Sequence, residues 1–218
     1  MNYPEGYVVG SVIGDGHIRY MGRNNNTPEV SLEVTDKNFA NKFKENLKQI
    51  TPKRINEYKR TKHNKFGKYE FDVKTIIVNV HDAKIFKLVK KFKENFKLIE
   101  NKSLDTVKGF LQGLFDAEGS LIMNSCRDKR YPWVVFYNKN VELLQTVKKL
   151  LSGFNIHSFI RFPKNRVSFL KICRKNDVLY FLQILPFSKM SIWSNDIQRF
   201  FCLTPKEKQT NLKKVKNI

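Results

Sequence analysis

The feature that most constrains the fold of this chain is an internal repeat. Residues 7–16, with the sequence YVVGSVIGDG, return at residues 110–119 as FLQGLFDAEG. The alignment places Gly10 on Gly113 and Asp15 on Glu118, with an offset of 103 residues in a chain of 218. A repeat at about half the chain length predicts two related halves, each of which begins with the same helix.

The elements after each copy follow the same order. Residues 29–35 alternate apolar and polar side chains, which predicts a half-buried strand, and an amphipathic helix follows Asp36. Residues 133–137 and the helix after Asn140 repeat this arrangement in the second half. Two more strands and a further helix are expected in each half, at residues 53–60, 69–80 and 83–96 in the first and 156–162, 166–173 and 177–185 in the second.

Each half therefore has the order αββαββα, which predicts an α+β fold with one four-stranded antiparallel sheet in each repeat. One face of each sheet is expected to pack on helices. The expected boundaries are 1–96 for the first repeat, 97–103 for a linker, 104–204 for the second repeat and 205–218 for a basic tail.

Small residues recur one turn apart on the two repeated helices. They are Gly10 and Gly14 in the first helix, and Gly109, Gly113 and Ala117 in the second. Glycine inside a helix costs about 1 kcal/mol relative to alanine, so its repetition needs a structural reason. Small residues at this spacing allow two helix backbones to approach closely. We therefore expect the two helices to pack against each other, with their C-terminal ends together.

An acidic residue ends each repeated helix. Asp15 and Glu118 are both followed directly by glycine, the usual residue just past a helix end. A carboxylate at a C-terminal helix end is unfavourable, which suggests that a cation neutralises it there. The cation could be a lysine, but a divalent metal is the sharper hypothesis. Two carboxylates beside phosphates on opposite strands are typical of metal-assisted phosphodiester hydrolysis.

The charge of the chain points to a polyanionic partner. Forty-one basic residues against 20 acidic ones give a net charge of +21, and a folded domain with this charge repels itself. DNA, RNA and an acidic membrane surface are the candidates, and nucleic acid is favoured. No apolar run approaches the roughly 20 residues that span a bilayer, and the first residues lack a leader pattern. We expect an intracellular protein, in a prokaryotic cytoplasm or nucleoid or an organelle matrix, without a membrane partner.

The repeated segments resemble the nine-residue motif of the LAGLIDADG homing endonucleases. Residues 111–119 match it better than residues 8–16, where Ser11 and Ile13 replace leucine and aspartate. The doubled αββαββα order is most similar to the monomeric, two-repeat, intron-encoded archaeal members. The resemblance implies pseudo-twofold-related repeats that form a DNA-binding saddle and pack through their motif helices. It also implies a Mg²⁺- or Mn²⁺-dependent monomer that hydrolyses both strands of a long, asymmetric DNA target.

The resemblance also assigns roles to particular residues. The last acid of each motif, Asp15 and Glu118, would bind the metal, in a site that includes Gly14 and Ala117. A polar residue and a lysine after the second strand would assist catalysis. The matching residues here are Asp36 with Lys37 and Asn138 with Lys139, although Asp36 departs from the more usual glutamine. Lys171 is the candidate for a further catalytic lysine. Asn79 lies nearest to its position in the first half, so the two active sites are expected to be unequal.

The outward faces of the two sheets are expected to contact DNA. The residue types at these positions are those that reach base edges and phosphates. The aromatic residues of the chain are expected to lie mostly in the core rather than on a surface that stacks with bases. The candidate DNA-binding residues are Arg19, Glu29, Ser31, Glu33, Thr35, Arg54, Asn56, Tyr58 and Arg60 in the first half, and Asn124, Arg127, Arg130, Arg161, Arg166 and Ser168 in the second.

Two other functions stay open at this point. One is an RNA maturase that binds its own intron on the same fold, and the other is a sequence-specific DNA-binding regulator that does not cut. The acids at both motif ends favour the nuclease, because binding alone does not need them. Metal dependence separates the classes, since a nuclease needs Mg²⁺ or Mn²⁺ whereas a binding protein holds its DNA in EDTA.

Overall fold

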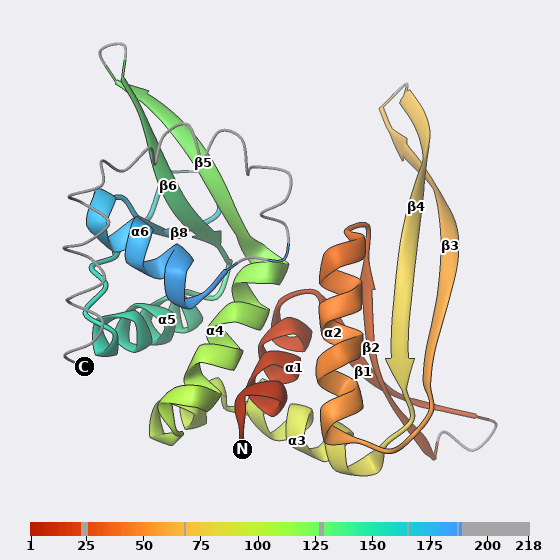
Figure 1. Cartoon of the computed structure of the whole chain (residues 1–218). Coiled ribbons are helices and arrows are strands. Elements are labelled where there is room, and N and C mark those ends of the chain that lie inside the picture. The colour runs from red at the N-terminus through yellow and green to blue at the C-terminus, as the bar shows by residue number, and fades with distance from the viewer. Residues whose placement is uncertain (23–25, 68, 127–128, 165, 187, 189–218) are drawn as a thin grey trace.

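A computed structural model describes residues 1–22, 26–67, 69–126, 129–164, 166–186 and 188. The expected tail at 205–218 and the last part of the second repeat lie outside the described residues (Figure 1). The first half contains α1 (Tyr3–Gly14), β1 (Gly16–Met21), β2 (Thr27–Val34), α2 (Lys37–Ile50), β3 (Ile55–Phe66), β4 (Tyr69–Val80) and α3 (Ala83–Glu94). The second half contains α4 (Leu104–Glu118), β5 (Gly119–Cys126), β6 (Lys129–Tyr137), α5 (Val141–Gly153), β7 (Phe159–Arg161), β8 (Phe169–Ile172) and α6 (Lys175–Ile184).

Each half contains one four-stranded sheet, and the two sheets have the same topology. The strand orders are β1-β2-β4-β3 and β5-β6-β8-β7, and every pair of neighbouring strands is antiparallel. Helices α1 and α4 lie side by side between the two sheets (Figure 1). The predicted α+β fold with two αββαββα repeats is therefore confirmed.

The contact between α1 and α4 is too close for side chains at its centre. A Cβ atom at Gly10 would lie 2.1 Å from the carbonyl oxygen of Phe110, and one at Gly113 would lie 2.2 Å from that of Tyr7. Backbone atoms cannot move aside without separating the helices, so only glycine fits these positions. Gly6 and Gly109 make equivalent backbone contacts one turn earlier. The predicted packing of the two motif helices is confirmed, and Gly6 extends it beyond the expected residues.

Polar side chains cap the starts of helices α1 to α5, as is typical of helix N-termini. In α1 a capping box joins Asn2 and Glu5 reciprocally. Asp82 accepts hydrogen bonds from the backbone N–H groups of Lys84 and Ile85 at the start of α3. Ser103 caps α4 by accepting from the N–H of Thr106. These caps fix where each helix begins and therefore how far its other end reaches.

Three element boundaries differ from the sequence prediction. Strand β3 continues past residue 60 to Phe66, because it pairs along its whole length with β4. Its outer part lacks apolar alternation and is stabilised by cross-strand charge pairs such as Lys65–Glu70 at 2.8 Å. In the second half, β7 and β8 are shorter than the expected 156–162 and 166–173. Ile156 lies between the end of α5 and the start of β7, and its N–H donates to the carbonyl of Leu151.

The expected linker at 97–103 falls largely within a 3-10 helix, η1 (Phe96–Asn101). Ile99 in this helix is completely buried and belongs to the hydrophobic core. The connection between the halves is therefore packed against them. Within the described part of the chain, none of the helices combines the length and apolar character needed to cross a membrane.

Candidate active site and nucleic-acid interface

The C-terminal ends of α1 and α4 meet at Gly14 and Ala117. A Cβ atom at Gly14 would lie 2.4 Å from the Cβ of Ala117 and 3.3 Å from the Cγ of Glu118. Asp15 is the C-cap of α1, and Glu118 is the last residue of α4. The structure thus brings the two motif acids to one end of a tightly packed helix pair, as the repeat predicts.

The glycines after the acids serve a different purpose from the one that the sequence suggests. Gly119 has a φ of −79°, and Gly16 is not among the residues with positive φ, so neither ends its helix in a left-handed conformation. A Cβ at Gly119 would instead lie 2.4 Å from the carbonyl oxygen of Phe115, and one at Gly16 would lie 2.7 Å from the Cα of Val12. The glycines let β1 and β5 start directly after the acids, so each acid lies at the edge of its sheet.

The strand registers of the two sheets define equivalent positions in the two repeats. Gly16 pairs with Leu32, and Gly119 pairs with Phe136. One residue further along, a row of four paired residues crosses each sheet. The rows are His17, Ser31, Asn79 and Asn56 in the first sheet, and Ser120, Val135, Lys171 and Phe159 in the second. Asn79 therefore occupies the position that matches Lys171.

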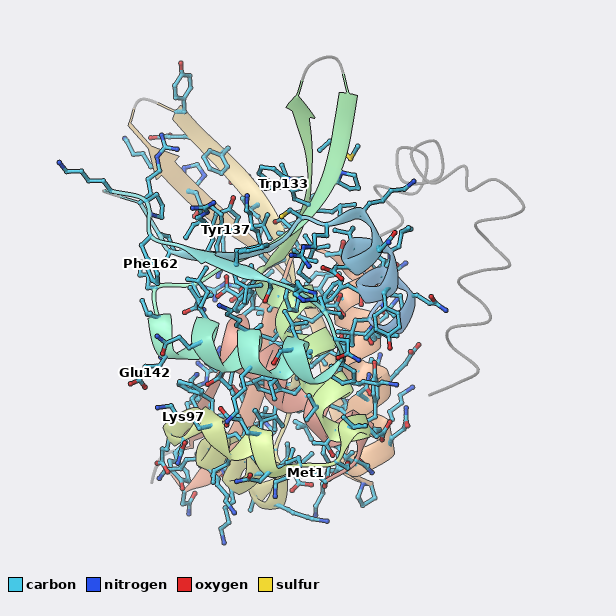
Figure 2. The ribbon with its side chains drawn as sticks, turned by 90° about the vertical axis from the view of Figure 1, so that its left-hand side faces the viewer. Met1, Lys97, Trp133, Tyr137, Glu142 and Phe162 are labelled. Atoms are coloured by element: carbon cyan, nitrogen blue, oxygen red, sulfur yellow. The ribbon has the colours of Figure 1, made fainter. Side chains whose placement is uncertain are left out.

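Lys171 lies on the outer face of the second sheet, near the motif end of α4. Its neighbours along β8, Leu170 and Ile172, are fully buried on the other face, and the lysine itself is half-buried. The Nζ atom lies 4.0 Å from the centre of the Trp133 ring, in a cation–π contact. Figure 2 places Trp133 and Tyr137 around the strands of this sheet, whereas Lys97 and Glu142 lie lower, among the helices. Ser120, two residues after Glu118, lies two strands away from Lys171 in the same row, and this separation corresponds to about 10 Å.

The expected pairs after the second strand are not structurally equivalent. Asp36 is the N-cap of α2 and accepts from the N–H of Phe39 at 2.8 Å. The N-cap of α5 is Asn140, which accepts from the N–H of Leu143 at 3.1 Å. The counterpart of Asp36 is therefore Asn140, and Asn138 lies two residues earlier. The helix N-cap position, rather than the Asn-Lys-Asn run, determines which residues of the two repeats are equivalent. Lys37 and Lys139 are both exposed.

A hydrogen-bonded chain crosses the outer face of the first sheet. Glu29 has only 2% of its surface exposed, and it accepts from Arg19 Nε at 2.8 Å and from Asn79 Nδ2 at 3.0 Å. Asn56 in turn donates to the side-chain oxygen of Asn79 at 3.0 Å. Glu29 was expected to contact DNA itself, but its carboxylate is occupied by these donors. It orients Arg19, whose side chain is 48% exposed.

Glu33 is the second acid on this face. Burial acts to raise the pKa of its carboxyl, but hydrogen bonds from Lys62 and Thr75 outweigh burial and lower the pKa below its usual value. The Lys62 ammonium lies 2.8 Å from one carboxylate oxygen, and the Thr75 hydroxyl donates to the other at 2.7 Å. Lys62 and Thr75 were not among the expected site residues. The sequence beyond Arg60 lacks apolar alternation, so no pattern indicated that Lys62 would lie on this face.

The remaining candidate DNA-binding residues differ in their accessibility. Ser31 is 1% exposed and therefore lies beneath its neighbours. Asn56 and Ser168 are half-buried. Arg127 lies outside the described residues, and only the backbone is described for Asn124 and Arg130. The exposed members of the set are Arg19, Thr35, Arg54, Tyr58, Arg60, Arg161 and Arg166.

The donor groups at the motif end suit a hard divalent cation. Carboxylate and backbone carbonyl oxygens are the ligands that Mg²⁺ and Ca²⁺ prefer, and both kinds are present at Asp15, Glu118 and the helix ends before them. Among the described residues, there is no group of three histidine, cysteine or acidic side chains that could form a complete metal cage. Mg²⁺ commonly uses one or two carboxylates and takes further ligands from substrate phosphates. The residues present therefore fit a metal that is bound together with nucleic acid.

Comparison with known proteins finds a matching domain and similar folds. The model of the LAGLIDADG-like domain matches residues 105–186. The complete fold is similar to that of the homing endonuclease I-DmoI in complex with DNA and Mn, with a TM-score of 0.56 and 18% identity. The similarity covers 84% of this chain and 96% of that one. The chain has the same two-repeat fold as that endonuclease, and its residues 105–186 match the LAGLIDADG-like domain.

Two uncharacterised proteins of Methanocaldococcus jannaschii are similar to this chain in sequence. They are 28% identical over 160 residues and 26% identical over 163 residues, which is 73% of this chain in both cases. The matched region spans 57% and 52% of their own lengths. A second structural neighbour is the N-terminal LAGLIDADG domain of WhiA, with a TM-score of 0.52 and 19% identity over 85% of this chain and 83% of that one. Other I-DmoI structures contain DNA with Ca, or the target DNA with Mg.

A buried polar cluster joins the two repeats away from the motif acids. Asp116 is fully buried and accepts from the Tyr7 hydroxyl at 2.7 Å and from the N–H and hydroxyl of Ser188 at 2.6 and 2.7 Å. Burial raises the pKa of this carboxyl, although these donors and Lys42 act against the rise. The Lys42 ammonium lies 3.9 Å away. Asp116 therefore has a structural role between the repeats, because its oxygens point to these four groups.

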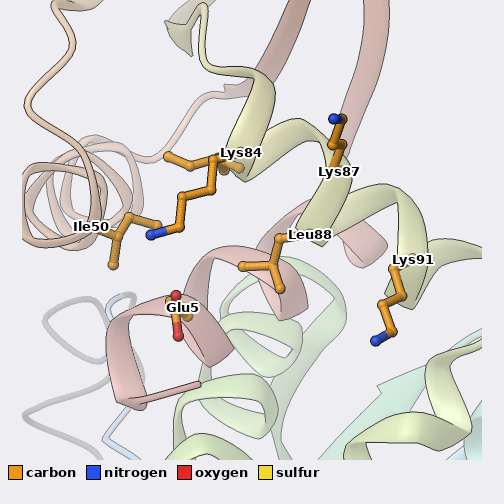
Figure 3. A pocket seen from close by; sticks show the side chains of 7 residues that line it. Glu5, Ile50, Lys84, Lys87, Leu88 and Lys91 are labelled. Carbon is orange, nitrogen blue, oxygen red and sulfur yellow. The ribbon is translucent and has the colours of Figure 1, made fainter.

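A hollow of about 280 Å³ lies at the opposite end of α1 from the motif acid (Figure 3). Ile50, Ile85 and Leu88 form its apolar part, and Lys84, Lys87 and Lys91 project around it. Its one acid, Glu5, already caps α1. Glu5 and Asp15 are ten residues apart on the helix, which corresponds to about 15 Å. The hollow is therefore separate from the candidate active site.

Proposed function

We propose that this chain is a divalent-metal-dependent endonuclease that cuts both strands of a long, asymmetric DNA duplex. The observation that carries this proposal is the meeting of Asp15 and Glu118 at the touching ends of α1 and α4. One chain supplies both acids, so a monomer would contain the complete pair. The net charge of +21 and the similarity to a DNA-bound endonuclease support duplex DNA as the substrate.

Asp15 and Glu118, with the carbonyl groups of Gly14 and Ala117, would hold the metal. When bound, a Mg²⁺ or Mn²⁺ ion supplies Lewis-acid stabilisation and an activated water for in-line attack on the phosphodiester. The sheet faces would hold the two strands so that one scissile phosphate lies beside each acid. Lys171 would stabilise the negative charge that develops on the phosphate in the second repeat. Lys37, Lys139, Asp36 and Asn138 would act at the outer margin of the site.

The two halves of the site would work at different rates. Lys171 provides a positive charge in the second repeat, whereas its counterpart in the first is the neutral Asn79, which already bonds Glu29 and Asn56. A developing phosphate charge near Asp15 would therefore receive less stabilisation than one near Glu118. A nicked intermediate with one preferred strand should accumulate before both strands are cut.

The direct experiment is cleavage of a randomised duplex library by the purified chain, with Mg²⁺ and with EDTA. We expect double-strand cuts at one long sequence with Mg²⁺ and none with EDTA. Sequence-specific binding without cuts under both conditions would support a DNA-binding regulator instead. Absence of specific duplex binding together with tight binding to structured RNA would support the maturase.

A further inference from the structure

The outer faces of the two sheets differ in chemical character at equivalent positions. The strand registers align Arg19 and Glu29 of the first sheet, which form an ion pair, with Ile122 and Trp133 of the second. At three more equivalent positions, a polar residue of the first sheet is replaced by an apolar or aromatic residue in the second. These positions are Ser31 and Val135, Glu33 and Tyr137, and Asn56 and Phe159. Ile77 of the first sheet is equivalent to Phe169 of the second.

The apolar residues form one continuous surface on the second sheet. Tyr137 and Phe169 are direct cross-strand neighbours, with ring centres 5.5 Å apart. Phe159 pairs with Lys171, whose ammonium covers the Trp133 ring. The exposed fractions are 39% for Tyr137 and 40% for Phe159. We refer to Trp133, Tyr137, Phe159 and Phe169 as the aromatic face.

The aromatic face adjoins the candidate active site. Lys171 lies within it, in the row of paired residues that begins at Ser120, two residues after Glu118. Arg161 pairs with Phe169 at its margin. Positively charged groups at the centre and margin of an apolar surface fit a partner with phosphates outside and apolar groups inside. The duplex that the motif acids would cut has this character where thymines expose their 5-methyl groups in the major groove.

We infer that the aromatic face reads a thymine-rich half of the target through the 5-methyl groups, while the first sheet reads its half through hydrogen bonds. This inference rests on the proposed function, since it requires a duplex on the sheet faces. The aromatic rings pack against methyl groups, Lys171 faces the scissile phosphate, and Arg161 holds a flanking phosphate. Aromatic rings cannot read the donor and acceptor pattern of a G·C pair, so they favour T over C at contacted positions.

The test replaces thymine with deoxyuridine in the duplex selected from the library. This change removes only the 5-methyl group and keeps base pairing. Binding is measured in EDTA, so the result does not depend on cleavage. We expect deoxyuridine in one half-site to raise the Kd by about fourfold for each contacted methyl group, from the transfer free energy of a buried methyl. The same change in the other half-site should alter the Kd by less than about twofold.

Ring-removing variants then assign the sensitive half-site to the aromatic face. In Phe159→Ala and Tyr137→Ala, the Kd for the thymine duplex should rise and most of the deoxyuridine effect should disappear. Tyr58→Ala is the matched control, because Tyr58 is an exposed aromatic on the first sheet at the position equivalent to Arg161. This control should weaken binding while the deoxyuridine effect stays. Thermal unfolding of each variant checks that the exposed substitutions leave the fold intact.

Each alternative result has a distinct meaning. Specific binding that is insensitive to deoxyuridine in both half-sites overturns this inference but leaves the proposed nuclease standing. Tighter binding to either single strand than to the duplex would also overturn it, because stacking on unpaired bases would then explain the aromatic face. Absence of any selected duplex overturns both proposals.

Discussion

At the scale of single residues, one side chain can satisfy a helix end and resemble a catalytic group at the same time. Asp36 was expected beside the active site because of its place after β2, and the structure shows its carboxylate bonded to the N–H of Phe39. Asn140 makes the same bond in the second repeat. Helix capping explains why a short polar residue occurs at both Asp36 and Asn140.

Two substitutions separate the cap from any catalytic role of Asp36. Asp36→Ala should lower the free energy of unfolding by about 1 kcal/mol, because the Phe39 N–H loses its acceptor. Asp36→Asn should change it by only a few tenths of a kcal/mol, since asparagine caps equally well. Urea unfolding gives the stabilities, and equal losses in both variants would contradict the capping account.

At the scale of elements, the contact between α1 and α4 determines the geometry of the site. The glycines at its centre remove side chains where the two backbones touch. Asp15 and Glu118 converge because the helices run together up to Gly14 and Ala117. A change in this contact would therefore alter the distance between the two acids.

Gly113→Ala should destabilise the protein by roughly 3 kcal/mol or more, because its Cβ would overlap the Tyr7 carbonyl oxygen and overpacking against backbone cannot relax locally. Gly153→Ala is the matched control, since a Cβ there meets nothing within 4 Å. The control should be neutral or slightly more stable, because alanine is the better helix former. Thermal unfolding measures both, and a small loss for Gly113→Ala would contradict the close packing.

The start of α3 adds a stability contribution that depends on pH. Burial acts to raise the pKa of Asp82, but donors from Thr51, Ile85 and Lys84 outweigh it and lower the pKa below 3.8. The contribution of the ionised cap is therefore present above pH 3.8 and is lost as the pH falls through the lowered pKa. Asp82→Asn keeps a cap without this titration. Its unfolding free energy should fall less than that of the wild type between pH 5 and about 3, and parallel curves would contradict the assignment.

At the scale of the whole molecule, the repeat predicted most of the fold and the least about the sheet faces. The doubled helix-strand order could be predicted from residues 7–16 and 110–119. Close contact between two helix backbones requires glycine, and the repeated glycines are visible in the sequence. The length of β3 could not be predicted from the sequence, because charge pairs rather than apolar alternation stabilise its outer part. The aromatic residues were expected to lie mostly in the core, and the aromatic face was not predicted, since alternation alone does not say which side of a strand is covered.

The net charge of +21 predicts strongly salt-dependent binding by the whole protein. If six to ten basic side chains contact phosphates, the affinity for duplex DNA should fall roughly 10³- to 10⁵-fold between 50 and 200 mM salt. Lys87 lies beside the hollow on the helical side, so Lys87→Gln should leave the slope of log Kd against log salt unchanged. Arg161 lies on the outer face of the second sheet, so Arg161→Gln should reduce this slope by about one. Equal slopes for both variants and the wild type would contradict the proposed orientation of the sheets toward DNA.

The central claim is that Asp15 and Glu118 form one metal-dependent cutting centre. The most direct test measures cleavage and binding by Asp15→Asn and Glu118→Gln on the selected duplex, with the wild type alongside in Mg²⁺. We predict that neither variant makes double-strand cuts and that both bind the duplex within about tenfold of the wild-type Kd, a difference of about 1.4 kcal/mol. Double-strand cleavage at the wild-type rate by either variant would contradict the account.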